Sequence, residues 1–346
     1  MTLTPSRPAH DVSIPPTASA TMLALVQDSY GEAADVLHVE RVPVPAVGVD
    51  DVLVDVHAAG LDQGVWHLMA GLPYAVRLAG YGVRAPKSRV RGGDLAGRVA
   101  AVGANVTSFQ VGDEVYGFGR ETFAAYAVAS AAKLARKPTN LTFEQAAAVP
   151  VSGLTALQAV RRSGVTSGQR VLVLGASGGV GHFAVQVAKA AGAEVAGVAS
   201  TAKLDFVRTL GADHVVDYTT DDLGSYAGTF DVIIDIAGNR PLRALRRLLT
   251  PRGTLVITGG EGGGRWLGGT DRQLRAMVLS AFVKQRLGTF IASENSADLE
   301  VLTDMIESGQ VSPWLDRAFP LAAAPEAIND LRAGRIRGKA VVLPSH

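Results

Sequence analysis

The sequence contains no cysteine, which excludes disulfides, thiolate nucleophiles and any zinc site with a Cys ligand. It also lacks an apolar run long enough to cross a bilayer, and its first residues do not resemble a signal peptide. Residues 1–20 carry four prolines among Ser and Thr, and we interpret them as a flexible polar tail. These absences predict a cytoplasmic protein with no membrane partner.

An excess of charge of either sign is also missing. Lys and Arg number 33 against 32 Asp and Glu, so the formal net charge is +1, and both signs are mixed along the chain. This balance argues against a nucleic-acid partner. Apolar residues make up 47% of the 346 residues, enough for two domains with a sizeable core.

The most specific signal is RVLVLGASGGVG at residues 170–181. An apolar run typical of a buried strand leads into Gly175, Gly178 and Gly181, and a helical pattern follows. This order sets backbone N–H groups and the positive end of a helix against a pyrophosphate. Glycine is needed because a Cβ would hold the phosphates away and spoil the turn. The stretch therefore predicts dinucleotide binding.

The chain divides at this point into two patterns. Short Val-rich runs cut by Gly, Pro and Asp fill residues 22–135 and predict an antiparallel, barrel-like domain. From residue 170, strands and helices alternate, which predicts a parallel sheet with helices on both faces. The expected strands are 36–42, 52–58, 97–102, 114–118, 122–129, 171–174, 194–199, 214–217, 231–236, 254–258 and 340–343. The expected helices are 142–148, 153–162, 183–191, 202–210, 242–249, 298–308 and 324–333.

Five stretches in this order resemble the medium-chain dehydrogenase/reductase superfamily, and in particular its zinc-free, quinone oxidoreductase-like branch. They are GGDLAGRVAAVGANVTSFQVGDEVYG (92–117), AAAVPVSGLTALQAV (146–160), VLVLGASGGVGHFAVQVAKAAGAEV (171–195), KLDFVRTLGADHVVDY (203–218) and GKAVVL (338–343). The resemblance implies an α/β fold: a GroES-like β-barrel domain at 21–152 and 293–346, and a doubly wound Rossmann domain at 153–292. It also implies pairing into a homodimer.

The residues after the strand at 194–199 indicate which nicotinamide cofactor binds. An NAD site usually has an acidic residue there, but this chain has Ser200, Thr201 and Lys203. Two hydroxyls and an ammonium suit a 2′-phosphate, so we predict NADPH. By resemblance, Tyr218 approaches the adenosine phosphate.

Further cofactor contacts follow from the resemblance. Ser177, Gly178, Gly179 and Val180 are expected to bind the pyrophosphate through backbone N–H groups, and Thr155 to lie beside the nicotinamide. Ala237, Gly238, Asn239, Gly259 and Gly260 end later strands at the same sheet edge, where the ribose and nicotinamide pass. We interpret His182 as a filler in the first helical turn.

The resemblance places the substrate beside residues 61–71, where Leu61-Asp62-Gln63 stands in place of the family's Asn-Pro-containing motif. Asp62 either orients a substrate hydroxyl or a water, or caps the next turn, and we favour the cap. Trp66 lines the cleft or belongs to the core. Tyr74 and Tyr81 are candidate proton donors, with half-buried aromatic packing as the alternative. With no Cys and no ligand set around His67, we expect no metal.

Two segments leave further alternatives open. Residues 72–91 contain five cations and no acid, so they either favour an anionic substrate at the cleft or form a solvated loop. Trp266, Leu267 and residues 277–283 either wall the pocket or meet a second subunit.

The leading prediction is metal-free, NADPH-dependent reduction of a conjugated C=C bond or a quinone in a small-molecule substrate. One alternative is a zinc-free reductase of aldehydes or ketones. The other is an NADPH-binding protein whose catalytic chemistry is vestigial, since no indispensable catalytic side chain is identifiable.

Overall fold

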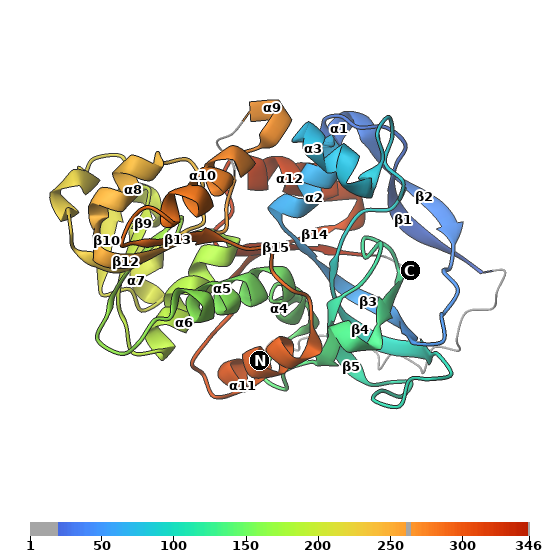
Figure 1. The fold of residues 1–346 in the computed structure, drawn as a ribbon. Coiled ribbons are helices and arrows are strands. Elements are labelled where there is room, and N and C mark those ends of the chain that lie inside the picture. Colours follow the sequence, from blue (N-terminus) through green and yellow to red (C-terminus); the bar gives the residue numbers. More distant parts are fainter. Residues whose placement is uncertain (1–19, 261–263, 345–346) are drawn as a thin grey trace, which may run out of the picture.

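A computed structural model describes residues 20–260 and 264–344, so the predicted tail lies outside the described residues except for Ala20. Two β-sheet regions stand side by side, with the parallel sheet at one end of the molecule and the antiparallel strands at the other (Figure 1). Among the described residues, no helix is both long and apolar enough to traverse a bilayer.

The parallel sheet has six strands in the order β10-β9-β8-β11-β12-β13, and every pairing is parallel. The chain enters at the centre, builds outward on one side and then on the other, which is the doubly wound order of a Rossmann fold. The strands are β8 (Arg170–Leu174), β9 (Glu194–Ala199), β10 (His214–Asp217), β11 (Phe230–Asp235), β12 (Leu249–Ile257) and β13 (Arg286–Thr289). The bounds predicted for β9 and β10 are confirmed, whereas β13 was not predicted.

The central strand shows why its sequence is apolar without interruption. Val171 and Val173 belong to the core formed with helices α5 (Pro150–Ser163) and α6 (Gly179–Ala190). Leu172 and Leu174 belong to the core on the opposite face, which also contains Leu245 and Leu248 of α8 (Leu242–Leu248). Helices therefore cover both faces, and each residue of β8 from Val171 to Leu174 is buried on one of them.

The other region, predicted to be a GroES-like domain, has a main sheet of seven strands. Its main path is β14-β15-β3-β4-β5-β7, with β6 paired to β3, and the pairings among β3 to β7 are antiparallel as predicted. The strands are β3 (Asp51–Leu61), β4 (Asp94–Val102), β5 (Glu114–Phe118), β6 (Tyr126–Ser130), β7 (Leu134–Arg136), β14 (Leu315–Pro320) and β15 (Lys339–Leu343). A separate hairpin pairs β1 (Thr21–Gln27) with β2 (Leu37–Pro43).

Two features of this region position the site. β15 pairs with β3, Ala340 opposite Leu61, so the C-terminal segment returns to the sheet of the N-terminal part. β6 begins at Tyr126 rather than at the predicted residue 122, because the residues before it meet β1 instead: the Leu25 N–H donates to the Phe123 carbonyl at 2.9 Å.

The remaining helices confirm most of the predicted periodicity. Helix α4 (Phe143–Ala147) begins with a capping box in which Thr142 and Gln145 exchange side-chain bonds, as expected for Thr142 as N-cap. Gly211 follows α7 (Leu204–Thr209) with φ of +94°, the left-handed conformation that ends a helix. The others are α1 (Ala33–Val36), α2 (Gln63–Ala70), α3 (Tyr74–Val76), α9 (Gly264–Leu267), α10 (Thr270–Ser280), α11 (Ser296–Glu307) and α12 (Ala324–Arg332).

Candidate cofactor and substrate site

The turn between β8 and α6 has the geometry of a phosphate cradle. Gly175 has φ of +83°, and its carbonyl accepts the Gly178 N–H at 3.1 Å. A Cβ on Gly181 would lie 2.0 Å from the Gly175 carbonyl oxygen, so only glycine lets the helix pack this closely on the turn. The N–H groups in the first turn of α6, from Gly179 and Val180 onward, have no partners within the helix and suit an anion.

A buried ammonium lies beneath this turn. Lys339, at the start of β15, is 2% exposed, and among the described residues its Nζ has no hydrogen-bond partner. A Cβ placed on Gly179 would lie 3.2 Å from the Lys339 Cδ, so the lysine stem passes under the cradle. The Ser177 carbonyl accepts the Gly338 N–H at 2.9 Å, which fixes β15 to the turn. A diphosphate would supply the hydrogen-bond acceptor that this ammonium lacks, so the residues fit the predicted cofactor.

Lys339 forms a long ion pair with Asp94 on β4, whose Oδ2 lies 3.9 Å from the lysine Nζ. Both carboxylate oxygens also accept the Val151 N–H, each at 3.2 Å, which joins β4 to the start of α5. Burial raises the pKa of Asp94 well above its usual value, and the Lys339 charge opposes this. Sequence reasoning missed both residues, although a charged residue next to an apolar run, such as Lys339 in GKAVVL, indicates a candidate functional residue.

The predicted adenosine end lies where β9 and β10 finish. The Tyr218 N–H donates to the Ala199 carbonyl at 3.1 Å, which sets Tyr218 beside Ser200. Thr201 donates its hydroxyl to Asp217 at 2.5 Å, an acid on the neighbouring strand that sequence reasoning missed. Hydrogen bonds from Thr201 and Thr219 hold the pKa of Asp217 below its usual value.

Lys203 is more constrained than its sequence context indicates. Its Nζ donates to the carbonyls of Gly334 and Ile336 at 2.7 and 2.8 Å, which ties the end of β9 to the segment before β15. Burial lowers the pKa of this ammonium, and the nearby guanidinium of Arg337 adds to that effect. Two of the three Lys203 N–H groups are therefore already used, and Arg337 is a second cation at this end that was not predicted.

The loops after β11 and β12 lie against each other, as their predicted role requires. Gly238 has φ of +69°, and a Cβ there would meet the Gly259 carbonyl carbon at 2.7 Å. The fully buried carboxylate of Asp235 accepts the Gly238 N–H at 3.1 Å and forms an ion pair with Arg272 of α10. These contacts hold Ala237, Gly238 and Asn239 in one conformation beside Gly259 and Gly260.

Two predicted residues on the helices near the cradle have well-defined local partners. Thr155 donates its hydroxyl to the Val151 carbonyl at 2.6 Å within α5. His182 is fully buried: its Nδ1 lies 3.2 Å from the Gly178 carbonyl and its Nε2 accepts the Trp314 N–H at 3.2 Å. Burial lowers the pKa of His182 to about 4, so it is a neutral packing residue, as predicted.

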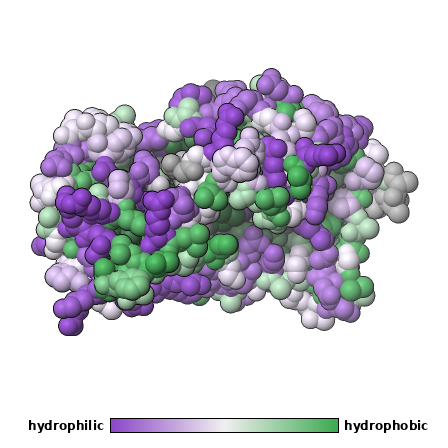
Figure 2. All heavy atoms as spheres, turned by 45° about the horizontal axis from the view of Figure 1, so that its top comes forward, coloured by the Kyte–Doolittle hydropathy of each residue, from purple (hydrophilic) through white to green (hydrophobic). Residues whose placement is uncertain are grey.

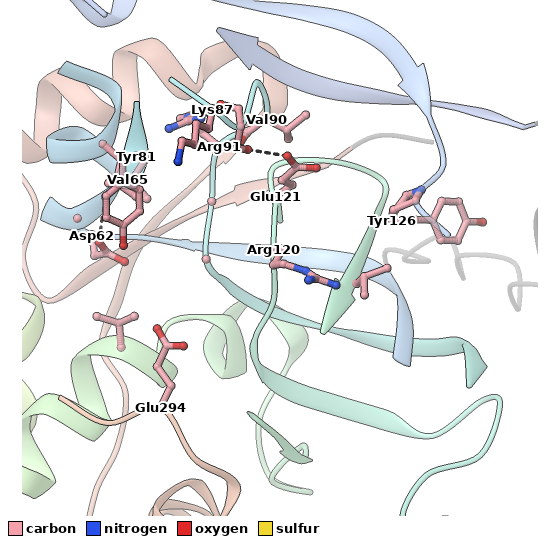
Figure 3. Close-up of a pocket in the computed structure, with 18 of the residues that line it drawn as sticks. Asp62, Val65, Tyr81, Lys87, Val90, Arg91, Arg120, Glu121, Tyr126 and Glu294 are labelled. Atoms are coloured by element: carbon pink, nitrogen blue, oxygen red, sulfur yellow. Dashed lines mark hydrogen bonds between the residues drawn. The ribbon is translucent and has the colours of Figure 1, made fainter. Parts of the chain in front are cut away.

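A pocket of about 650 Å³ opens in the GroES-like domain next to the junction. Figure 2 shows the molecule hollowed between its two halves, with apolar side chains in the hollow. Figure 3 shows the pocket, with Asp62 and Tyr81 at one side and Arg91 and Glu121 beyond them. The Val151 side of the pocket adjoins Asp94, and through it the Lys339 ammonium under the cradle.

Of the four predicted catalytic residues, the structure brings Asp62 and Tyr81 to this pocket. Asp62 is the N-cap of α2, and its Oδ1 accepts the Val65 N–H at 3.1 Å, which confirms the capping role. Trp66 does not line the pocket because it packs under the Arg332 guanidinium, 3.6 Å from its ring centroid. Tyr74 also lies outside the lining, edge-on to Trp266 at the contact between α3 and α9.

Within residues 20–260 and 264–344, no three His, Cys, Asp or Glu side chains are grouped so that they could hold a metal ion. His67 bonds the Leu72 carbonyl at 2.7 Å through its Nδ1. The donor set for a catalytic zinc is therefore not assembled at this pocket.

The fold and the cradle define a nicotinamide-dependent oxidoreductase, and comparison with known proteins gives its family. Residues 48–139 match the alcohol dehydrogenase GroES-like domain, and residues 210–342 match the zinc-binding dehydrogenase family. The chain belongs to the medium-chain dehydrogenase/reductase superfamily.

Within it, the relatives indicate the quinone oxidoreductase-like branch. The chain is 31% identical to a chloroplast envelope quinone oxidoreductase homolog of Arabidopsis thaliana, covering 94% of this chain and 100% of the relative. It is 32% identical to the NADPH-dependent alkenal/one oxidoreductase of the same plant, covering 96% and 81%. The structure of the quinone oxidoreductase from Coxiella burnetii superposes with a TM-score of 0.81 at 27% identity, covering 94% and 100%.

Proposed function

We propose that this oxidoreductase transfers hydride from NADPH to a quinone or to the conjugated C=C bond of an enone, without a metal. The observation that carries the proposal is the continuity between cradle and pocket. The side chain of Lys339 passes under Gly179, and its Nζ lies 3.9 Å from Asp94 Oδ2. Asp94 in turn accepts the N–H of Val151, which lines the pocket. A dinucleotide seated on the cradle would thus present its nicotinamide at the pocket.

The pocket residues supply the surroundings that such a reduction needs. The bound cofactor provides a hydride for the β-carbon of an enone, and the α-carbon then requires a proton. Val65, Leu68 and Val90 give the wall an apolar character that excludes water from the reacting atoms. Tyr81, a half-exposed phenol on the lining, is the candidate that can donate this proton, whereas Tyr74 lies outside.

A screen of cofactor consumption tests this assignment. Quinones, enones and aldehydes are offered with NADPH, and product analysis identifies the bond that is reduced. We expect turnover with the first two classes and a loss of enone reduction, but not of quinone reduction, in Tyr81→Phe. Turnover of aldehydes alone would favour a carbonyl reductase, and tight cofactor binding with no turnover would favour a binding protein.

The preference for NADPH over NADH rests on the end of β9. No acid occupies the positions from Ser200 to Lys203. Arg337 is a second cation near Lys203, and it pairs with Asp316 at 3.4 Å. The carboxylate of Asp217 lies close by, but its oxygens accept bonds from Thr201 and Thr219. We expect Arg337→Gln to raise the Michaelis constant for NADPH about tenfold and to leave that for NADH nearly unchanged. An equal effect on both cofactors would contradict the assignment.

We also propose that the chain forms a homodimer through α10 and β13. Leu274, Met277, Val278 and Phe282 are exposed on and just after α10, and β13 is the last strand of its sheet. An exposed apolar face beside an open strand edge favours a second copy of the chain. Light scattering should give a dimer that Val278→Asp converts to a monomer, while Val49→Asp, which changes an exposed valine elsewhere, leaves it intact.

A further inference from the structure

Three basic and three acidic side chains line the substrate pocket, but among the described residues not every one of the cations has an ion-pair partner. Six charged side chains line it: Asp62, Lys87, Arg91, Arg120, Glu121 and Glu294. Asp62 caps α2, and Glu294 pairs with Lys133 at 2.7 Å. Arg120 pairs with Asp51 at 2.9 Å. Glu121 accepts the Ser88 hydroxyl at 2.6 Å. Within the described part of the chain, Lys87 and Arg91 are left with no carboxylate at ion-pair distance.

Arg91 is the more unusual of the two cations. The residue is only 6% exposed, yet it lines the pocket. Its guanidinium donates to the Ser88 carbonyl, and its Nε is buried with no hydrogen-bond partner among the described residues. Burial lowers the pKa of this guanidinium, with Glu121 acting in the opposite direction. A buried guanidinium with unfilled donors is costly unless a ligand completes them.

The loop that carries these cations is held rigidly. Glu121 is the one non-glycine residue with positive φ, +62°, among those described, and it holds the 88–92 segment through its bond to Ser88. A Cβ on Gly92 would lie 2.4 Å from the Thr122 hydroxyl, so the backbone of the 88–92 segment packs directly against the Thr122 side chain. Figure 3 shows Lys87 and Arg91 together on this loop, between Tyr81 and Glu121.

We propose that the pocket selects substrates with an acidic group, and that Arg91 and Lys87 bind this group. The substrate class is then an enone or quinone that carries a carboxylate away from the reacting bond. This inference rests on the reductase function proposed above. Arg91 lines the pocket with a guanidinium, whose planar array of N–H donors suits a carboxylate, and the exposed Lys87 adds a second positive charge.

Binding measurements test this proposal without relying on turnover. The probes are levulinate and its longer keto-acid homologues, each compared by calorimetry with its own methyl ester. We expect at least one acid to bind about tenfold tighter than its ester, and this preference to shrink at high salt. Equal affinities for every acid and ester pair would overturn the proposal.

Three variants locate the preference. Arg91→Gln is expected to remove it, and Lys87→Met to reduce it about threefold. Arg89→Met is the matched control, because Arg89 lies on the same segment but pairs with Asp28 and Glu40 outside the lining. Because Arg91 is buried, its variant is checked by circular dichroism, and the exposed Lys87 decides the matter if Arg91→Gln does not fold. An acid preference that survives Lys87→Met unchanged would count against the site.

Turnover of the matching unsaturated keto acids separates this proposal from the broader one. Selective acid binding without reduction of any enone would support the anion site and overturn the reductase assignment. Reduction of enone acids and esters alike, with equal binding of both, would support the reductase and overturn the anion site.

Discussion

The cofactor end and the substrate end of the cleft are built by different means. At the cofactor end the backbone sets the shape, because a Cβ at Gly181 would collide with the Gly175 carbonyl. At the substrate end side chains from distant segments meet, as Ser88 and Glu121 do across 33 positions of sequence. A shape made by backbone is encoded locally by glycine, whereas one made by side chains depends on the whole fold.

Both ends nevertheless share one electrostatic feature. Lys339 lies under the cradle and Arg91 beside the pocket, and among the described residues neither the Lys339 Nζ nor the Arg91 Nε has a hydrogen-bond partner. Within that part of the chain, Lys339 has only the ion pair with Asp94 at 3.9 Å. The two cations differ in what holds them. Lys339 starts a strand paired with β3, and Arg91 belongs to a loop fixed by Ser88. In the functions proposed above, Lys339 would face the diphosphate of the cofactor and Arg91 the acidic group of the substrate.

The largest effect is expected from a substitution in the glycine turn at the cofactor end of the cleft. Gly181→Ala places a Cβ 2.0 Å from the Gly175 carbonyl oxygen, so strand and helix must separate. We expect a loss of about 1–3 kcal/mol in the free energy of unfolding from overpacking and a dissociation constant for NADPH raised by about a hundredfold or more. Calorimetry and urea unfolding measure both. Gly288→Ala is the control, since a Cβ there meets nothing within 4 Å.

The next effect concerns pH at the same end. In the unfolded chain His182 takes up a proton near its ordinary pKa of 6.5, but the folded protein resists protonation until about pH 4. The stability linked to His182 is therefore present above pH 6.5 and is lost as the pH falls toward 4. By linkage, this loss amounts to about 3 kcal/mol over that window.

Urea unfolding at several pH values measures this term in the wild type and in His182→Gln. The variant should lack this pH dependence, because its amide does not titrate and can still accept the Trp314 N–H. Parallel curves for the two proteins would show that His182 is not the group responsible.

The difference between the two ends also explains what the sequence could predict. The cradle, the alternation of strands and helices, and the cap at Asp62 were predictable because each depends on neighbouring residues: glycine spacing, apolar periodicity and an acid before a turn. β13 was missed because Leu287 is the one strongly apolar residue in Arg286–Thr289, whereas β10, equally short, contains the pair Val215-Val216. The bonds from Lys203 to the carbonyls of Gly334 and Ile336 join residues about 130 positions apart, which no local pattern indicates.

The substrate pocket was predictable only in part. Tyr81 and the basic segment 72–91 were identified, but their spatial relation to Glu121 and Arg120 depends on how two loops of the GroES-like domain fold together. By its position Trp66 could line the cleft or belong to the core, and in the structure Arg332 from α12 covers its ring. Tertiary contacts decide such cases, and the sequence offers only alternatives.

A smaller effect tests whether the buried ammonium serves the cofactor. Lys339→Met combined with Asp94→Asn replaces an imperfect buried pair with neutral groups of similar size. We expect the dissociation constant for NADPH to rise about tenfold while the free energy of unfolding at neutral pH is maintained or increased. The raised pKa of Asp94 supports this expectation. The folded protein favours the protonated carboxyl, so the stability that Asp94 contributes at low pH is lost as the pH rises through its pKa. If stability and cofactor binding fell together, Lys339 would be a structural residue.

The smallest effect separates capping from catalysis at the substrate end. Asp62 holds the Val65 N–H at 3.1 Å and also lines the pocket. Asp62→Asn keeps an oxygen acceptor for the cap, whereas Asp62→Ala removes it and should cost about 1 kcal/mol in the free energy of unfolding. If Asp62 acts mainly as a cap, turnover should fall in the same order as stability, from wild type through Asn to Ala. A carboxylate that orients the substrate or a water would instead make Asn as slow as Ala at undiminished stability. Steady-state kinetics and thermal unfolding on the same three proteins distinguish these outcomes.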